Sequence, residues 1–486
     1  MTVAPARATL LIGPDRVPAD GRPDETAIFN PADREVVGYA PVADAALVER
    51  AVAAAAGAFP AWSRRPAGQR AGYLSAIAGW IRSQETRLAT LLTLEQGKPL
   101  SESRSEVETA AKAFEFYAAE AIRVYGQTIP TDSATLRSTV IRQPFGVVAA
   151  IATWNYPLGL MAWKIAPALA AGCTVVAKPA EDTPLTVLDL VAGTAGLGLP
   201  AGVLNSLHGD GRIGSLLAGH PQVAKISFTG GTATGRSLLE LAARDIKSVT
   251  LELGGHSPMI VNDDAPLDLA VADGVKRSFR NAGQLCNSIN RIFVTRAVAD
   301  EFVDRFVTQT AKLVLGPGLA EPEPDLGPLS NARTLERVEE HVADARRRGA
   351  DVLAGGERPE DDQLAAGFFY PPTVVVGGED LVMLREETFG PVAPILVVAD
   401  LDEAITRANG LDYGLVCHLY TRDLRASIEG AERLEFGTVN VNNVGGGDVR
   451  FPYGGWKQSG LGLELAHQGL DDYLQVKHIR VEIGYR

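Results

Sequence analysis

The chain has 486 residues, of which 46% are hydrophobic and 22% are charged, and its net charge is −13. This length suits roughly two to four ordinary domains, and the composition is typical of a soluble globular protein with an ample core. The negative charge argues against general binding to nucleic acid or to an anionic membrane surface.

The cysteines and the apolar segments exclude further classes of protein. The three cysteines lie far apart and no Cys/His cluster has metal-site spacing, so we expect neither a disulfide framework nor a metal site. The chain shows no secretory signal, and no apolar run reaches the roughly 18 residues of a membrane span. A cytoplasmic enzyme in a reducing compartment is the simplest expectation.

The first quarter of the chain changes from irregular to helical. Turn-forming residues in 1–41 predict an irregular arm with short strands. Alanine-rich stretches predict helices at 45–59, 67–95 and 101–120, with a break at 97–99.

A β-rich segment at 125–142 predicts a hairpin, because Gly126, Pro130 and Asp132 punctuate it. This hairpin has no evident partner inside a sheet of its own. Open edge strands tend to pair with another chain, so we expect the hairpin to take part in oligomerisation.

Strands alternate with helices most clearly in residues 146–252. Strands are predicted at 146–152, 174–178, 203–207, 225–228 and 247–251, with helices between them at 158–171, 184–196, 211–219 and 232–243. This alternation is typical of βαβ units and of a parallel sheet.

A second alternation follows Pro258 and predicts a second α/β domain. Its helices are predicted at 267–280, 298–314 and 333–348, its strands at 392–398, 416–420 and 437–441, and a last strand at 473–483.

Two charged side chains follow the strand predicted at 174–178. In doubly wound sheets, ligands lie at the carboxyl ends of the strands, which is where Lys178 and Glu181 are expected. A carboxylate there can accept both hydrogen bonds of a ribose diol, and it repels a 2′-phosphate. A solvated salt bridge at the strand end is an equally good interpretation of this motif alone.

A glycine-rich turn at 226–235 connects a strand to a helix and contains Gly230, Gly231 and Gly235. The N-terminus of such a helix is an anion site. The turn is not the dinucleotide fingerprint, because Thr232 interrupts it and the acidic residue lies upstream.

Three motifs carry groups suited to covalent catalysis. Asn155, in Thr-Trp-Asn-Tyr-Pro, can donate its amide to a developing oxyanion, although the same residues also build ordinary turns. Glu252 lies in Leu-Glu-Leu-Gly-Gly and Cys286 in Gly-Gln-Leu-Cys. A thiol and a carboxylate supply a nucleophile and a base for a later water, although an isolated cysteine is more often a small buried hydrophobe.

Two later segments are individually more typical of packing than of function. One, at 386–392, contains Glu387 and Phe389, and the other, at 452–460, is a glycine-rich loop that contains Tyr453.

In this order, the motifs resemble the NAD(P)-dependent aldehyde dehydrogenase superfamily, and the similarity runs from Asn30 to the final strand. The resemblance implies an α/β protein with a Rossmann-like parallel-sheet cofactor domain, an α/β catalytic domain and a β-flap that builds homodimers or homotetramers. The implied boundaries are 1–122 and 143–254 for the NAD-binding domain, 255–470 for the catalytic domain, and 123–142 and 471–486 for the oligomerisation strands.

The resemblance also implies residue roles. Cys286 would be the nucleophile, Glu252 the base for the hydrolytic water, and Asn155 an oxyanion donor together with the backbone N–H of Cys286. Lys164 and Glu464 match a pair proposed to relay protons. The implied cofactor contacts are Lys178 and Glu181 at the adenine ribose, Glu387 at the nicotinamide ribose, and Trp154, Gly230, Gly231, Gly235 and Phe389. Gly231 departs from the serine of many members, and Leu463 from a usual arginine.

Three other functions are weighed against this one. Members of the CoA-acylating branch generally lack the carboxylate that is Glu252 here, which favours hydrolysis. A structural protein of the lens type is expected to have lost Cys286, and a thiol hydrolase needs a histidine base that none of these motifs contains. For the cofactor we expect NAD rather than NADP, because Glu181 would oppose a 2′-phosphate.

The substrate expectation begins with Phe279–Gln284, which resembles the succinate-semialdehyde branch. That branch holds the substrate carboxylate with an arginine at the position of Arg280, with a second arginine where this chain has Trp163, and with a serine where it has Asp448. We expect Asp448 to offset the charge of Arg280.

Side chains around the entrance would then form an apolar tunnel of Tyr156, Leu160 and Trp163, near Tyr453. Such a tunnel rewards burial of a hydrocarbon by about 0.8 kcal/mol per methylene. We therefore expect an uncharged aliphatic or aromatic aldehyde as substrate. The alternative is a succinate-semialdehyde-like carboxylated or hydroxy aldehyde, for which Arg450 could supply the missing cation.

Overall fold

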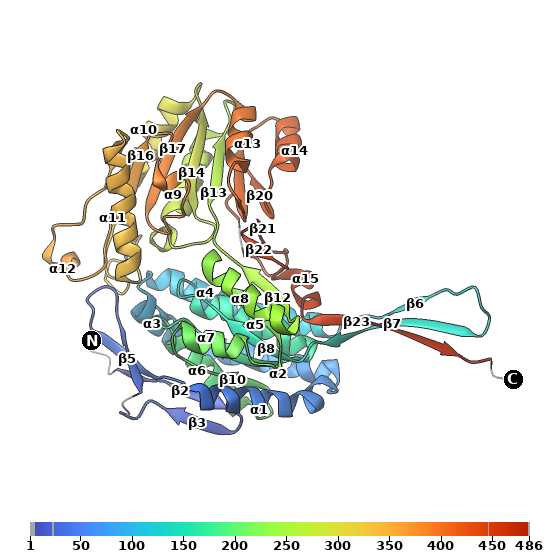
Figure 1. The fold of residues 1–486 in the computed structure, drawn as a ribbon. Helices are drawn as coiled ribbons and strands as arrows, with labels where there is room; N and C mark the ends of the chain where they lie inside the picture. The colour runs from blue at the N-terminus through green and yellow to red at the C-terminus, as the bar shows by residue number, and fades with distance from the viewer. Residues whose placement is uncertain (1–4, 22–23, 446, 485–486) are drawn as a thin grey trace.

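The structure is a computed structural model that describes residues 5–21, 24–445 and 447–484. Residues 1–4, 22–23, 446 and 485–486 lie outside the described residues, and they fall in the predicted segments 1–122, 255–470 and 471–486. Two α/β lobes face each other, and an arm of long strands extends from the lobe that holds the N-terminus (Figure 1).

The first lobe is built on a six-stranded sheet with the order β10-β9-β8-β11-β12-β22. Its strands are β8 (Val147–Ile151), β9 (Thr174–Lys178), β10 (Leu204–Ser206), β11 (Val223–Thr229), β12 (Ser248–Glu252) and the distant β22 (Gly460–Leu461). The first five are parallel, as predicted, and only β22 runs antiparallel to its neighbour β12. In chain order this is the 3-2-1-4-5 arrangement of a Rossmann-like sheet, whose ligands lie at the carboxyl ends of the strands near the switch point between β8 and β11.

Helices cover both faces of this sheet, and a strand from the N-terminal part of the chain packs against its edge strand β10. The connecting helices are α5 (Pro157–Ala171), α6 (Leu185–Thr194), α7 (Gly211–Ala218) and α8 (Thr232–Asp245). The N-terminal elements are β1 (Ala6–Arg7), β2 (Thr9–Ile12), β3 (Asp15–Pro18), β4 (Glu25–Phe29), β5 (Val36–Pro41), α1 (Ala45–Ser63), α2 (Ala67–Ser83), α3 (Glu85–Gln96) and α4 (Leu100–Ala121).

The single helix predicted at 67–95 is wrong, because the chain turns at Gln84 between α2 and α3. The Ser83 hydroxyl donates to the Trp80 carbonyl, which competes with continuation of the helix. The turn lets Ile81 and Leu88, both fully buried, reach the same apolar core.

The second lobe is built on a seven-stranded sheet with the order β15-β16-β17-β14-β13-β19-β20. Its strands are β13 (Ser257–Val261), β14 (Ile289–Thr295), β15 (Asp351–Ala354), β16 (Thr373–Val376), β17 (Val392–Val398), β19 (Val416–Tyr420) and β20 (Thr438–Val441). Its helices are α9 (Leu267–Phe279), α10 (Ala299–Thr310), α11 (Ala332–Arg347), α12 (Asp362–Ala365), α13 (Leu401–Asn409) and α14 (Leu424–Arg433).

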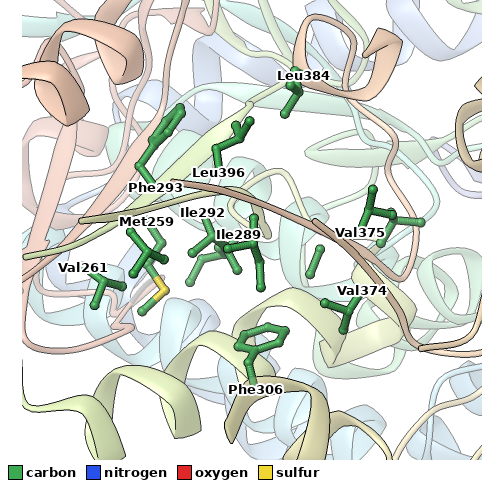
Figure 2. Packing of buried hydrophobic residues seen from close by; sticks show 14 of the residues in the cluster. Met259, Val261, Ile289, Ile292, Phe293, Phe306, Val374, Val375, Leu384 and Leu396 are labelled. Atoms are coloured by element: carbon green, nitrogen blue, oxygen red, sulfur yellow. The ribbon is translucent and has the colours of Figure 1, made fainter. Parts of the chain in front are cut away.

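Sequence patterning missed four of these strands and the helices α13 and α14. Every residue of β13 and β14 is buried, so neither strand shows the alternation of a half-buried strand. In Figure 2 the side chains of Met259 and Ile292 lie on the side of the strands that faces Phe306 of α10, whereas Phe293 lies on the opposite side.

The projecting arm is a three-stranded antiparallel sheet of β6 (Gln127–Ile129), β7 (Leu136–Pro144) and β23 (Leu474–Glu482). The predicted hairpin is confirmed, but its supposed lack of a partner is wrong, because β23 pairs along the whole length of β7. Within the described residues the outer edges of β6 and β23 pair with no other strand.

Three short elements lie between β20 and β23: β21 (Trp456–Lys457), β22 and α15 (Ala466–Asp471). β21 pairs with β18 (Tyr413–Gly414), which precedes β19. Because β22 lies against β12, this segment returns from the second lobe to the first. In the described part of the chain, no helix has the length and apolarity that crossing a membrane requires.

Candidate active site

A cleft of about 640 Å³ opens at the carboxyl ends of β8, β9, β11 and β12 and is closed by residues of the second lobe. Predicted site residues from both lobes line it together: Trp154, Asn155, Leu160, Lys178, Glu181, Gly230, Gly231, Cys286, Glu387 and Phe389. Gly235 does not line the cleft. It packs under Leu253, and a Cβ on it would lie 2.5 Å from that side chain.

The loop before Cys286 has a strained backbone. Asn281 and Ala282 have φ angles of 48° and 53°, in the left-handed region that non-glycine residues rarely adopt. The Gln284 side chain fixes this turn, because its amide nitrogen donates to the Asn281 carbonyl at 2.9 Å and its oxygen accepts the Ser330 N–H at 2.8 Å. Strain of this kind is held by surrounding structure and is common at active sites.

Glycine lets the strand that carries Glu252 pass close to this loop. A Cβ on Gly255, three residues after Glu252, would lie 2.1 Å from the carbonyl oxygen of Cys286. The Leu-Glu-Leu-Gly-Gly motif therefore brings the two predicted catalytic groups into one site because no side chain separates their backbones.

The Cys286 thiol lies 3.3 Å from the hydroxyl of Tyr453. Burial raises the pKa of this thiol to about 12, and the Tyr453 hydrogen bond opposes that rise. The thiol is therefore mostly protonated at neutral pH until a base or a ligand changes its surroundings.

Asn155 is held at both its side chain and its backbone. Its Nδ2 donates to the carbonyl oxygen of Gln284 at 2.9 Å, and its own carbonyl accepts from the ammonium of Lys98 at 2.7 Å. A side-chain amide has two N–H groups, so the second remains for an oxyanion in the cleft beside Cys286.

Glu252 ends β12 in a buried position, and neither of its carboxylate oxygens has a hydrogen-bond partner among the described residues. Burial and the nearby Glu464 raise the pKa of Glu252 well above its usual value, and Lys164 opposes this. Lys164 itself pairs with Glu464 and donates to the Thr229 hydroxyl at 2.7 Å. The predicted base and the predicted relay pair are therefore neighbours.

Glu387 lines the cleft together with the aromatic residues Trp154 and Phe389. Burial raises the pKa of Glu387 to about 8, and its Oε1 has no hydrogen-bond partner in the described part of the chain. Trp154 and Phe389 lie edge to face with ring centroids 5.3 Å apart. An orphaned buried carboxyl oxygen in an open cleft fits a ligand hydroxyl group.

Lys178 and Glu181 also line the cleft. The Lys178 ammonium donates to the Pro179 carbonyl at 3.1 Å, and burial lowers its pKa. Glu181 is exposed and also lines an adjoining hollow of about 560 Å³ together with Arg212. Arg212 is bound to Asp210 at 2.8 Å.

The predicted pairing of Arg280 with Asp448 is wrong. The Nε of Arg280 donates to Glu102 of α4 at 3.4 Å, and Glu102 also accepts the Tyr156 hydroxyl at 3.2 Å. Asp448 instead binds Arg450, two residues along its own loop, at 2.7 Å. Asp448 is thus already paired with Arg450, and Glu102 is the carboxylate that pairs with Arg280.

Two of the aromatic residues predicted at the substrate entrance lie against each other. The rings of Trp163 and Tyr453 meet edge to face with centroids 5.9 Å apart, and the Tyr453 hydroxyl reaches Cys286. Leu160 lines the adjacent cleft.

Sequence patterning missed several polar residues of this site. Lys98 was assigned only to a helix break, and Glu102, Glu106 and Arg277 only to helix faces. The one available signal was a lysine in the break between two helices, at Gly97-Lys98-Pro99, where a lysine does not belong to the solvated face of a helix. The cleft is also lined by Asn331, Ala332, Arg333, Thr334 and Arg337 at the start of α11.

Comparison with known proteins identifies the family to which the chain belongs. The model described as the Aldehyde dehydrogenase family matches residues 18–479. A 3-sulfolactaldehyde dehydrogenase of Pseudomonas putida is 42% identical over 454 residues, which are 93% of each chain. A glutarate-semialdehyde dehydrogenase of P. putida is 42% identical over 457 residues, 94% of each chain. A succinate-semialdehyde dehydrogenase [NADP(+)] of Escherichia coli is 42% identical over 453 residues, 93% of each chain.

Solved structures of similar proteins have the same fold. An NADP-dependent enzyme of E. coli superposes with a TM-score of 0.95 at 41% identity over 98% of each chain. A betaine aldehyde dehydrogenase of Staphylococcus aureus in complex with NAD+ gives a TM-score of 0.96 at 34% identity, over 99% of this chain and 96% of that one. The chain belongs to the aldehyde dehydrogenase family and is an oxidoreductase that acts on aldehydes with NAD(P).

Proposed function

We propose that this enzyme oxidises an aldehyde whose far end carries an anionic group, such as the semialdehyde of a short dicarboxylic acid. The observation that carries the proposal is the state of Arg280. Its hydrogen bond to Glu102 uses only Nε, and its terminal nitrogens donate to no carboxylate in the described part of the chain. A guanidinium can bind a carboxylate through two parallel hydrogen bonds.

The relatives also support an anionic aldehyde over an uncharged one. Succinate and glutarate semialdehydes carry a carboxylate, and 3-sulfolactaldehyde carries a sulfonate, as the names of the three relatives state. Trp163 and Leu160 still favour an apolar chain between the two ends of the substrate, so an uncharged aldehyde is the second candidate.

In the first chemical step we assign the nucleophile to Cys286. Its thiolate adds to the aldehyde carbon, and the oxygen that becomes negative accepts hydrogen bonds from the free N–H of Asn155 and from the Cys286 backbone. The Tyr453 hydroxyl stabilises the thiolate before the attack.

The cleft fits a dinucleotide because the orphaned Glu387 oxygen and the open space beside Gly231 leave room and partners for it. Bound NAD(P) supplies the hydride acceptor. The protein residues then hold a thioester on Cys286, and Glu252 removes a proton from the water that hydrolyses it. Lys164 and Glu464 carry that proton away from Glu252.

For the cofactor we propose NAD rather than NADP, although one of the relatives is named for NADP(+). Glu181 is an exposed carboxylate at the cleft, and the nearby cation Arg212 is engaged by Asp210. A 2′-phosphate beside Glu181 would therefore face that carboxylate, and Lys178 is the cation that shares this part of the cleft.

We also propose the predicted domain boundaries and a homodimer or homotetramer built through the arm. The open edges of β6 and β23 and the exposed side chain of Val476 support this.

An aldehyde panel tests the proposed substrate. Purified enzyme is mixed with NAD or NADP, with and without CoA, and NADH or NADPH formation is followed at 340 nm for succinate semialdehyde, glutarate semialdehyde, butanal and pentanal. We expect the semialdehydes to have the higher kcat/KM, and no dependence on CoA. A higher kcat/KM for butanal or pentanal would contradict the proposal.

A further inference from the structure

Arg277 is a buried cation without an anionic partner. It lies in the last turn of α9, with 9% of its surface exposed, and no carboxylate of the described residues lies within ion-pair distance. Its guanidinium donates to the Val444 carbonyl and, at 3.3 Å, to the side-chain oxygen of Asn287. Both acceptors are neutral.

Burying a guanidinium without a counter-ion is costly. Asp273, one helical turn earlier on α9, does not supply the anion, because its carboxylate accepts the Tyr420 hydroxyl at 2.8 Å. Arg280 adds a second positive charge nearby, and burial together with Arg280 lowers the pKa of Arg277. Of the two arginines, only Arg280 has an ion-pair partner among the described residues, and that partner is Glu102.

Arg277 lies near the nucleophile. It donates to Asn287, which directly follows Cys286, and its charge acts on the hydroxyls of Tyr156 and Tyr453 and on the Cys286 thiol. The Tyr453 hydroxyl lies 3.3 Å from that thiol, so an anion that neutralises Arg277 would lie close to the aldehyde.

We propose that Arg277 is a specificity-determining residue that, together with Arg280, holds the anionic end of the substrate. The inference rests on the proposed function and deepens it. A carboxylate or a sulfonate would replace neutral acceptors with charge-assisted hydrogen bonds and supply the missing counter-ion. The shared requirement is a compact anion at the end of the substrate remote from the aldehyde.

The test compares charged and neutral substrates of similar length. Arg277→Gln, Arg277→Lys and the control Lys276→Gln, which changes the adjacent exposed cation of α9, are each measured with succinate and glutarate semialdehydes and with butanal and pentanal. We expect Arg277→Gln to lower kcat/KM for the semialdehydes by about tenfold to a hundredfold. The values for butanal and pentanal, and all values of Lys276→Gln, should stay close to those of the wild type.

A purely structural role would lower kcat/KM for charged and neutral aldehydes alike, and that result would overturn the inference, as would unchanged semialdehyde kinetics. If Arg277→Gln does not fold, Arg277→Lys, which keeps the charge but not the fork geometry, should show a smaller loss confined to the semialdehydes. Inhibition of butanal oxidation by glutarate should also weaken in the variant. A wild-type enzyme that prefers butanal would instead refute the proposed function itself.

Discussion

The ammonium of Lys98 donates a hydrogen bond of 2.7 Å to the carbonyl oxygen of Asn155, a residue 57 positions further along the chain. Lys98 is paired at 2.6 Å with Glu106, and both side chains are fully buried. The other Glu106 oxygen accepts the N–H groups of Leu158 and Gly159 at the start of α5. A buried ion pair thus fixes the backbone at the proposed oxyanion donor and at the start of the helix that follows it.

Replacement of Lys98 by Met should lower kcat by about tenfold to a hundredfold, because small displacements of a catalytic donor are costly. It should also destabilise the fold by about 3–5 kcal/mol, since Glu106 is left as an uncompensated buried charge. Steady-state kinetics and thermal unfolding measure the two effects. The double variant Lys98→Met, Glu106→Gln separates them: stability should recover while kcat stays low. Lys112→Met, at an exposed position of α4, is the control, and full activity of the double variant would contradict a positioning role.

Replacement of Glu252 by Gln should separate acylation from deacylation. The variant lacks the base, so one NADH equivalent should form per active site in a burst. Steady-state turnover should then be lower than that of the wild type by about a hundredfold. Because burial raises the pKa of Glu252 above its usual value, wild-type deacylation should speed up as the pH rises through that raised pKa, and the variant should lose this dependence. Stopped-flow absorbance measures both, with Cys286→Ala as a burst-free control. Unchanged steady-state turnover in the Gln variant would assign the base to another group.

Replacement of Tyr453 by Phe should make the Cys286 thiol less acidic, because the hydroxyl stabilises the thiolate. With a pKa near 12 in the wild type, the alkylation rate by iodoacetamide should rise about tenfold per pH unit through the neutral range. At each pH the variant should react more slowly, which quenched mass spectrometry of the intact protein can follow. A faster reaction in the variant would show that the hydroxyl shields the thiol instead.

Replacement of Glu181 by Gln should relax the cofactor preference. Removal of the carboxylate abolishes its repulsion of a 2′-phosphate, so kcat/KM with NADP should rise relative to NAD by about tenfold, the scale of one strong charge contact. Arg212→Gln in the same assay should lower NADP use if that cation contributes. Equal efficiency of the wild type with both cofactors would remove Glu181 as the selective residue.

A charge on the arm should weaken oligomerisation. Val476 is 69% exposed on β23, and Val476→Asp would place a carboxylate in the proposed interface. Analytical ultracentrifugation should show a smaller species for this variant and an unchanged species for Leu424→Asp, on the exposed face of α14. An unaltered assembly in both variants would place the interface elsewhere.

Local patterns were enough for the Rossmann-like half of the fold. The strands and helices of 146–252 were predicted closely, because short apolar runs bounded by turn residues alternate there with helical stretches. The strands β13 and β14 escaped prediction, since a short apolar run can belong to a buried helix or to a buried strand, and the break at Gln84 escaped because a helix pattern continues across it.

The sequence by itself determined that two reactive groups lie at the carboxyl ends of strands of one parallel sheet, Asn155 after β8 and Glu252 at the end of β12, and that Cys286 lies in a glycine-rich loop. Parallel strands bring their carboxyl ends to one edge of a sheet, so chain order alone predicts that such groups meet. Only the tertiary structure decided which charges pair. Arg280 binds Glu102, 178 positions away, instead of Asp448, and Arg277 has no acid at all within ion-pair distance among the described residues. The partner of a buried charge depends on how helices from distant parts of the chain pack, and no periodicity along the sequence encodes that choice.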